Sequence, residues 1–120
     1  MSRHAKTALA VVAAIFASFA TPSAIAAEPF NVVSSRDSFV SLVQGKELRR
    51  FGIRLTVSAD GAIQGRAFGT PVTGAWDWEN GYFCRDLFFG DDDLGVNCQL
   101  VQVNGETLRF TRDHGQGNYA

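Results

Sequence analysis

Methionine, cysteine, histidine and proline are scarce in this chain, which has one, two, two and three of them among 120 residues. His114 is the only histidine beyond the first few residues, so a zinc site lacks the further ligands that it would need. No activated-serine motif occurs, and a general base at His114 would need partners held around it. The sequence therefore predicts no catalytic residue and no cofactor. An enzyme that uses Asp86 or His114 as its acid or base is the first alternative.

The longest apolar run is too short to cross a membrane. It extends over Ala8–Ala20, follows the basic residues Arg3 and Lys6, and precedes the small residues Ala24 and Ala26. A basic start, a short apolar segment and an A-x-A site are the three parts of a secretory signal peptide. The sequence therefore predicts an exported protein that is cleaved near Ala26.

Removal of residues 1–26 leaves one small domain over residues 27–120, which we expect in the periplasm or outside the cell. Cys84 and Cys98 both lie in this domain, and an even number of cysteines in an oxidising compartment predicts one disulfide. No cysteine lies near the cleavage site. We therefore expect neither a lipid anchor nor a membrane span.

An excess of positive charge is also absent. The formal net charge is -1, and it becomes more negative once Arg3 and Lys6 leave with the signal peptide. A nucleic-acid partner would require a basic surface. The expected partner is therefore an unknown small molecule or an envelope protein.

One helix is expected at the start of the domain. Ser34 and Asp37 form an S-x-x-D pattern, which is typical of a helix N-terminus. Apolar residues at helical spacing follow from Phe39, and Gly45 fits the left-handed position that ends many helices. The pattern predicts a single helix of about ten residues.

From Glu47 onward the apolar residues alternate, and three turn signals end in glycine, at residues 59–61, 79–81 and 103–105. Three-residue loops with a left-handed glycine would bring apolar residues opposite one another, whereas two-residue loops would mix the faces. The predicted pairs are Val57 with Ile63, Trp78 with Tyr82, Trp76 with Cys84, Cys98 with Phe110, and Leu100 with Leu108. The predicted strands cover residues 47–58, 62–68, 72–78, 82–89, 96–102 and 106–112.

Tight hairpins between successive strands predict a mainly β fold, a six-stranded antiparallel meander with one short N-terminal helix and one disulfide. The sheet would be a half-open barrel or a curled sheet covered by the helix. Because Trp76 and Trp78 share a face with Cys84 in the predicted register, we expect them to pack against the disulfide. The longer loop Gly90–Gly95 would join the two cysteine strands.

Arg50, Arg54 and Arg66 are predicted to share one outward face, with Arg54 directly opposite Arg66. Like charges in such positions destabilise a sheet. Either carboxylates such as Asp77 and Asp86 neutralise them in an ion-pair network, or the arginines form an anion-binding face for a carboxylate, a phosphate or an acidic polymer.

Two weaker candidate sites remain. Trp76, Trp78 and Tyr82 could line an aromatic ligand pocket, although aromatic residues two apart on a strand are more often core. Asp91 and Asp93 lie in an acidic loop that could bind calcium, although the loop lacks the later ligands of an EF-hand and is more simply a solvated turn.

Aromatic, arginine and glycine residues recur in the runs Glu47–Ile53, Gly65–Pro71, Gly74–Trp78 and Gly81–Arg85, and further on in Asn97–Gln99 and Leu108–Phe110. These runs, over most of the domain, resemble a family of small exported bacterial proteins, some of which carry the label dihydrodipicolinate reductase. That enzyme has a G-x-x-G-x-x-G nucleotide-binding turn after its first strand and a histidine-rich substrate motif. Neither occurs in this sequence, so the resemblance implies no catalytic residue.

Together these features predict an exported, non-catalytic binding or interaction module of the cell envelope. Two alternatives stay open: an enzyme, such as the oxidoreductase that the label names, and an inhibitor of an envelope hydrolase that presents the acidic loop Gly90–Gly95.

Overall fold

Residues 29–120 are described by the structure, which is a computed structural model. The predicted signal peptide and its cleavage site lie outside these residues. The described part contains eight strands and two helices. In chain order these are β1 (Asn31–Val32), α2 (Arg36–Val43), β2 (Glu47–Arg50), β3 (Ile53–Val57), β4 (Ala62–Ala67), β5 (Thr70–Glu79), β6 (Tyr82–Phe89), β7 (Asp92–Asn104), β8 (Thr107–Thr111) and α3 (Arg112–Gly115).

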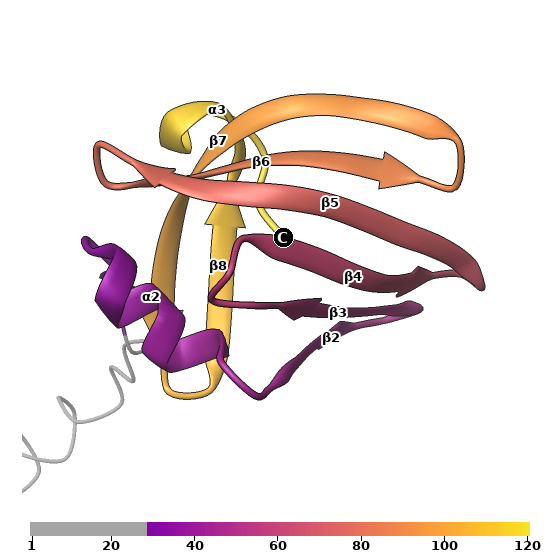
Figure 1. The fold of residues 1–120 in the computed structure, drawn as a ribbon. Coiled ribbons are helices and arrows are strands. Elements are labelled where there is room, and N and C mark those ends of the chain that lie inside the picture. The colour runs from indigo at the N-terminus through magenta and orange to yellow at the C-terminus, as the bar shows by residue number, and fades with distance from the viewer. Residues whose placement is uncertain (1–28) are drawn as a thin grey trace, which may run out of the picture.

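The strands form one curled antiparallel sheet. From β2 to β7, each strand pairs with the next. β7 is 13 residues long: it pairs with β6 as far as Gln99 and then with β8 from Leu100 onward. Figure 1 shows β8, and the later part of β7 that pairs with it, running across the direction of β3 and β4. Because β2 and β8 do not pair with each other, the barrel stays half open, and the predicted fold class is confirmed.

The core is aromatic and centres on one residue of α2. The ring of Phe39 is 0% exposed. Its centroid lies 5.2 Å from that of Trp76, 5.3 Å from that of Trp78, 5.0 Å from that of Phe83 and 6.2 Å from that of Phe110. Truncation of such a buried ring to alanine typically costs about 3–5 kcal/mol. The helix therefore closes the concave side of the sheet with this side chain.

The helix begins one residue later than the sequence pattern suggests. Ser35, not Ser34, is the N-cap, and its Oγ accepts a hydrogen bond from the backbone N–H of Ser38 at 3.2 Å. Gly45 has the expected left-handed conformation, with φ of 71°. A second short helix, α3, was not predicted.

The predicted strand over residues 47–58 is in fact a hairpin, β2 and β3. The chain reverses at Phe51–Gly52, where Gly52 has φ of 75°, and Arg50 pairs with Ile53. The alternating pattern continues through this reversal, so it does not reveal the break. The consequence is that Phe51 leaves the sheet and becomes exposed.

Only the first of the three predicted turns has the predicted length. Val57 pairs with Ile63 across a three-residue loop that ends in Gly61, as expected. The next turn has two central residues, Asn80 and Gly81, both with positive φ, which is the type I′ pattern. The last turn also has two central residues, since Asn104 pairs with Thr107.

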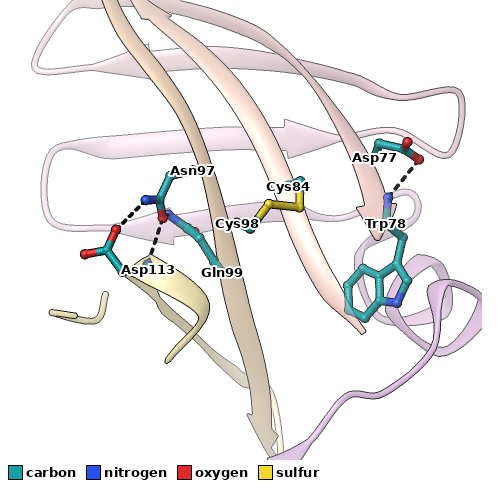
Figure 2. Close-up of a disulfide and its surroundings, with 7 residues drawn as sticks. All are labelled: Asp77, Trp78, Cys84, Asn97, Cys98, Gln99 and Asp113. Carbon is teal, nitrogen blue, oxygen red and sulfur yellow. Dashed lines mark hydrogen bonds between the residues drawn. A yellow bond between two sulfur atoms is a disulfide. The ribbon is translucent and has the colours of Figure 1, made fainter. Parts of the chain in front are cut away.

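This difference of one residue changes which face the tryptophans share. Trp76 pairs with Arg85 and Trp78 with Phe83, whereas Cys84 pairs with Asp77 and Cys98. The disulfide between Cys84 and Cys98 is confirmed, with the two Cα atoms 3.9 Å apart. The prediction that the tryptophans pack against it is wrong, because a register shift of one residue turns side chains to the other face. Figure 2 shows the disulfide with Trp78 set apart from it.

The predicted loop Gly90–Gly95 is also shorter than expected. Phe89 pairs with Asp92, so only Gly90 and Asp91 connect β6 to β7. The register shifts by a bulge between Leu87 and Phe88, just before this turn. The aspartates after the turn belong to β7.

Candidate functional site

Three arginines lie side by side on three neighbouring strands. Arg49 of β2 is directly opposite Arg54 of β3, which is directly opposite Arg66 of β4. The facing pair Arg54 and Arg66 is the predicted one. The prediction that Arg50 shares their face is wrong: the chain reverses after Arg50, which pairs with Ile53, so Arg49 instead lies on the face of Arg54 and Arg66.

Arg50 nevertheless joins the same site from the edge of β2. A hollow of about 340 Å³ opens near the β2–β3 and β4–β5 turns. We call it the arginine hollow. It is lined by Arg49, Arg50, Gly52, Ile53, Arg54, Arg66 and Gly69. The structure thus brings together all three predicted arginines and adds a fourth, Arg49.

Among the described residues, one carboxylate forms ion pairs with this cluster. Oε1 of Glu47 lies 2.7 Å from Nε of Arg49 and 3.8 Å from Nε of Arg54. Nη1 of Arg66 donates to the carbonyl oxygen of Gly69 at 2.9 Å, and Arg50 has no partner among the described residues. Four guanidinium groups and one carboxylate leave the arginine hollow with a net positive charge.

The carboxylates predicted as partners do not neutralise the arginines. Arg66 pairs across strands with Pro71 at the start of β5, whereas Asp77 lies at the far end of that strand. The side chain of Asp77 accepts a hydrogen bond from the backbone N–H of Trp78, as Figure 2 shows. Asp86 lies on β6, and one of its oxygens is buried without a hydrogen-bond partner.

Two phenylalanines stand exposed beside the arginine hollow. Phe51, in the β2–β3 turn, is 90% exposed, and Phe68, in the β4–β5 turn, is 68% exposed. Their ring centroids are 6.5 Å apart. Alternation within the predicted strands had placed both rings on a sheet face. The signal that could have found them is the glycine that follows each one, Gly52 and Gly69, because glycine readily adopts the positive φ that the second position of a tight turn requires.

The two phenylalanine turns are joined to each other. The backbone N–H of Phe68 donates to the carbonyl oxygen of Gly52 at 2.7 Å. The ring of Phe68 lies against this glycine so closely that a Cβ at position 52 would be 2.3 Å from its Cε1. We call Phe51 and Phe68, with the two turns that carry them, the phenylalanine tip. The ring of Phe68 is thus held against the β2–β3 turn.

The predicted aromatic pocket is divided between the two faces of the sheet. Trp76 is buried against Phe39, and its Nε1 donates to the carbonyl oxygen of Ser58 at 2.8 Å. Trp78 stacks on the same ring. Tyr82 instead contacts His114, with centroids 4.7 Å apart. The three side chains do not line one hollow.

The predicted acid or base residues are also set apart. His114 is exposed and rests on Tyr82, and Asp86 is partly buried on β6. Neither residue lines the arginine hollow, nor any of the three other hollows that are described below.

The candidate calcium ligands are separated as well. Oδ1 of Asp93 accepts a hydrogen bond from the N–H of Gly95 at 2.8 Å. In the part of the chain that the structure describes, Asp91 and Asp93 join no cluster of three metal-ligating groups. Glu79, Cys84 and Cys98 do come within 4.8 Å of one another, but both sulfurs are in the disulfide.

A polar network holds α3 against β7, and the sequence did not reveal it. Nδ2 of Asn97 donates to Oδ1 of Asp113 at 2.7 Å, and Nε2 of Gln99 donates to Oδ1 of Asn97 at 3.3 Å (Figure 2). Nearby, the buried Arg85 donates to the carbonyl oxygen of Gly95 at 2.8 Å. Burial and the charge of Arg112 lower the pKa of Arg85. These contacts fix the C-terminal part of the chain.

A further hollow, a groove of about 630 Å³, lies between strands β2 and β8, which do not pair with each other. Its walls are mostly apolar and include Leu48, Leu55, Leu108 and Phe110. Two smaller hollows of about 460 and 390 Å³ adjoin β2 and β8, and β1 and α2.

Among residues 29–120, no helix has the length and apolar character that crossing a membrane requires. The chain matches no family model, and comparison with the curated proteins and with the solved structures returns no match.

Proposed function

We propose that this protein is an exported, non-catalytic binding module that holds an anionic group in the arginine hollow. The disulfide is compatible with an oxidising compartment such as the periplasm or the exterior of the cell. The proposed ligand carries a phosphate or carboxylate group, because guanidinium groups bind both through paired hydrogen bonds.

The observation that carries the proposal is the row of like charges on β2, β3 and β4. Arg49, Arg54 and Arg66 occupy directly opposed positions, which destabilises a sheet by roughly 0.2–1 kcal/mol for each pair. Within residues 29–120, Glu47 is the one carboxylate that forms ion pairs with them, and these exposed pairs contribute little. A bound anion would remove this repulsion, so the arrangement supports a binding role.

The experiment uses inorganic tripolyphosphate as a soluble probe in a calorimetric titration. We expect binding that weakens as salt is added, because the contacts are exposed. The double variant R54Q/R66Q should lose about tenfold in affinity, as expected for two charge-assisted hydrogen bonds near solvent.

The matched control is R112Q, which removes one positive charge on α3, away from the arginine hollow. Its affinity should stay within about twofold of the unaltered protein, since a distant exposed charge is screened. Absence of binding by the unaltered protein, or equal losses in R112Q and R54Q/R66Q, would contradict the proposal.

A second candidate function is the binding of an extended peptide from an envelope protein in the groove between β2 and β8. The observation that favours it lies at the outer edge of β8, where Phe110 and Ala120 exchange backbone hydrogen bonds of 2.8 and 3.0 Å. Ala120 of the same chain thus already occupies the edge beside Phe110, and a bound peptide would replace this segment or pair along the rest of β8, the mode known as strand addition. Amide shift changes on β2 and β8 during titration with short apolar peptides would support it, and an unchanged spectrum would exclude it.

A further inference from the structure

We propose that the phenylalanine tip and the arginine hollow together dock the protein on the surface of a bilayer that contains anionic lipid. The arginine part of this inference rests on the proposed function. The phenylalanine part does not, because it comes from separate residues and makes a separate prediction.

The first argument is the exposure of the two rings. Phe51 and Phe68 expose 90% and 68% of their surface, although phenylalanine normally lies in a core. The β2–β3 and β4–β5 turns lie at the same end of the sheet in Figure 1, and the two ring centroids are 6.5 Å apart, so the exposed rings form one patch at this end. Aromatic rings at such a tip can enter the boundary between headgroups and acyl chains.

The second argument is the backbone of Phe68. Its φ is 51°, in the left-handed region that bulky side chains rarely adopt. Asparagine or glycine would suit this turn position better, as Asn80 does with the same φ of 51°. A residue that opposes its local conformation points to a role outside folding.

The third argument is charge. Arg49, Arg50, Arg54 and Arg66 surround a hollow beside the rings. Basic residues beside exposed apolar side chains are the combination that binds anionic lipid surfaces, since each part strengthens the other. The charge complementarity therefore selects an anionic bilayer over a neutral one.

The acidic residues of the β6–β7 turn restrict the orientation. This turn reaches the same end of the sheet as the phenylalanine tip (Figure 1), since the N–H of Gly90 donates to the carbonyl oxygen of Pro71 at 2.8 Å, next to the β4–β5 turn. In the sheet order, β4 and β5 separate Asp91, Asp92 and Asp93 from the β2–β3 hairpin. An anionic surface would repel these carboxylates and attract the arginines, so the molecule would tilt with the β2–β3 hairpin nearest the lipid and the β6–β7 turn away from it.

The test is co-sedimentation of the protein, purified after export, with two kinds of vesicle. One contains phosphatidylcholine alone, and the other also contains phosphatidylglycerol. We expect at least about tenfold stronger binding to the anionic vesicles, and loss of this difference at high salt.

Two variants separate the rings from the charges. F51S/F68N should weaken binding to anionic vesicles by about tenfold while tripolyphosphate affinity stays within about twofold, because the arginines remain. R54Q/R66Q should weaken both. The matched control for the rings is V96S, which removes an exposed apolar side chain on β7 and should change neither.

Each other outcome overturns the inference in an identifiable way. Tripolyphosphate binding without vesicle binding would overturn the lipid inference and leave the proposed function standing. Vesicle binding that survives F51S/F68N would also overturn it. Binding to neither probe would remove both. If the unaltered protein is a dimer in solution and F51S/F68N is a monomer, the phenylalanine tip binds a second copy of the chain instead.

Discussion

β5 begins and ends with the same kind of turn, and the two turns differ in one residue. Phe68–Gly69 has φ values of 51° and 83°, and Asn80–Gly81 has values of 51° and 88°. Asparagine is a favoured residue in this conformation, whereas phenylalanine is strained in it. The Asn80 turn is therefore suited to folding. The Phe68 turn keeps an exposed ring beside the arginine hollow at some cost in stability.

The surroundings of the two turns follow the same division. The end of β5 near Asn80 carries Trp76 and Trp78, which pack on Phe39, and the disulfide lies on the neighbouring strands. The end near Phe68 carries exposed rings and charges. We infer that one end of the strand determines the fold and that the other is free to bind.

The largest expected effect on stability comes from removing the disulfide, which lies on the strands beside the Asn80 end of β5. The bond closes a loop of 14 residues. C84A/C98A should lower the free energy of unfolding by about 3 kcal/mol, because the unfolded chain regains conformational freedom. Urea denaturation measures the change.

The unaltered protein under reducing conditions serves as the control, and it should show the same loss. Tripolyphosphate affinity of the folded C84A/C98A protein should stay within about twofold, since the arginine hollow lies on other strands. A large loss of affinity would show that the two ends are coupled.

The next largest effect on stability comes from placing phenylalanine in the Asn80–Gly81 turn. N80F should lower the free energy of unfolding by about 1–2 kcal/mol, because it puts a bulky side chain at φ of 51° without a partner for its ring. Thermal denaturation followed by circular dichroism measures it. An unchanged melting temperature would mean that the backbone at this turn relaxes, and the comparison of the two turns would fail.

The reverse exchange should have a smaller effect and the opposite sign. F68N should raise the free energy of unfolding by about 0.5–1 kcal/mol, since asparagine adopts positive φ more readily. The gain is reduced because the ring also gives up its contact with Gly52. G69A is the matched variant that should destabilise, because Gly69 has φ of 83°. Destabilisation by F68N would show that the ring contributes to folding.

The smallest expected effect on stability concerns the turn at residues 59–61, which connects β3 to β4. Oγ of Ser58 donates to Oδ1 of Asp60, and the N–H of Ala62 donates to the same oxygen at 3.2 Å. The hydrogen bond from Ser58, then that from Ala62, lower the pKa of Asp60. Because the folded pKa lies below the unfolded one, this stabilisation is present at neutral pH and is lost as the pH falls through the folded pKa.

D60A should therefore be less stable than the unaltered protein at neutral pH, and the difference should shrink in acid. Paired denaturation curves at several pH values measure it. A difference that is constant with pH would contradict the assignment of the hydrogen bonds to the ionised carboxylate.

Sequence reasoning could predict the features that depend on local chemistry. The turn that ends in Gly61, the helix that carries Phe39, and the pairing of Cys84 with Cys98 all follow from nearby residues or from the only possible partner. The antiparallel fold follows from short connections between alternating segments. These are the parts of the fold that the structure confirms.

Hydrophobic alternation could not decide the choice of face, because both faces of β6 carry apolar residues. Tyr82 and Cys84 alternate with Phe83 and Leu87, so alternation supports either register. The length of the Asn80 turn decides between them. The Asn80–Gly81 pair favours a two-residue loop, and this local preference holds in the structure over the match of apolar residues that favoured three.

The candidate site was predicted only in part, because its residues also depend on where the strands turn. Arg54 and Arg66 were placed correctly opposite each other, because their register follows from the turn that ends in Gly61. Arg49 and the exposed Phe51 were missed, because the reversal at Gly52 interrupts a pattern that otherwise reads as one strand. An apolar residue that serves outside the core has the same hydrophobicity as one within it.

The length of β7 has a consequence for how the molecule opens. One half of the strand is bonded to β6 and the other half to β8, with the covalent link at Cys98 just before the change of partner. If either β6 or β8 separates from β7, the strand to which the other is bonded also loosens. We therefore expect β6 and β8 to separate from β7 in one cooperative step. The amide hydrogens of β7 before and after Gln99 should then exchange slowly and at similar rates.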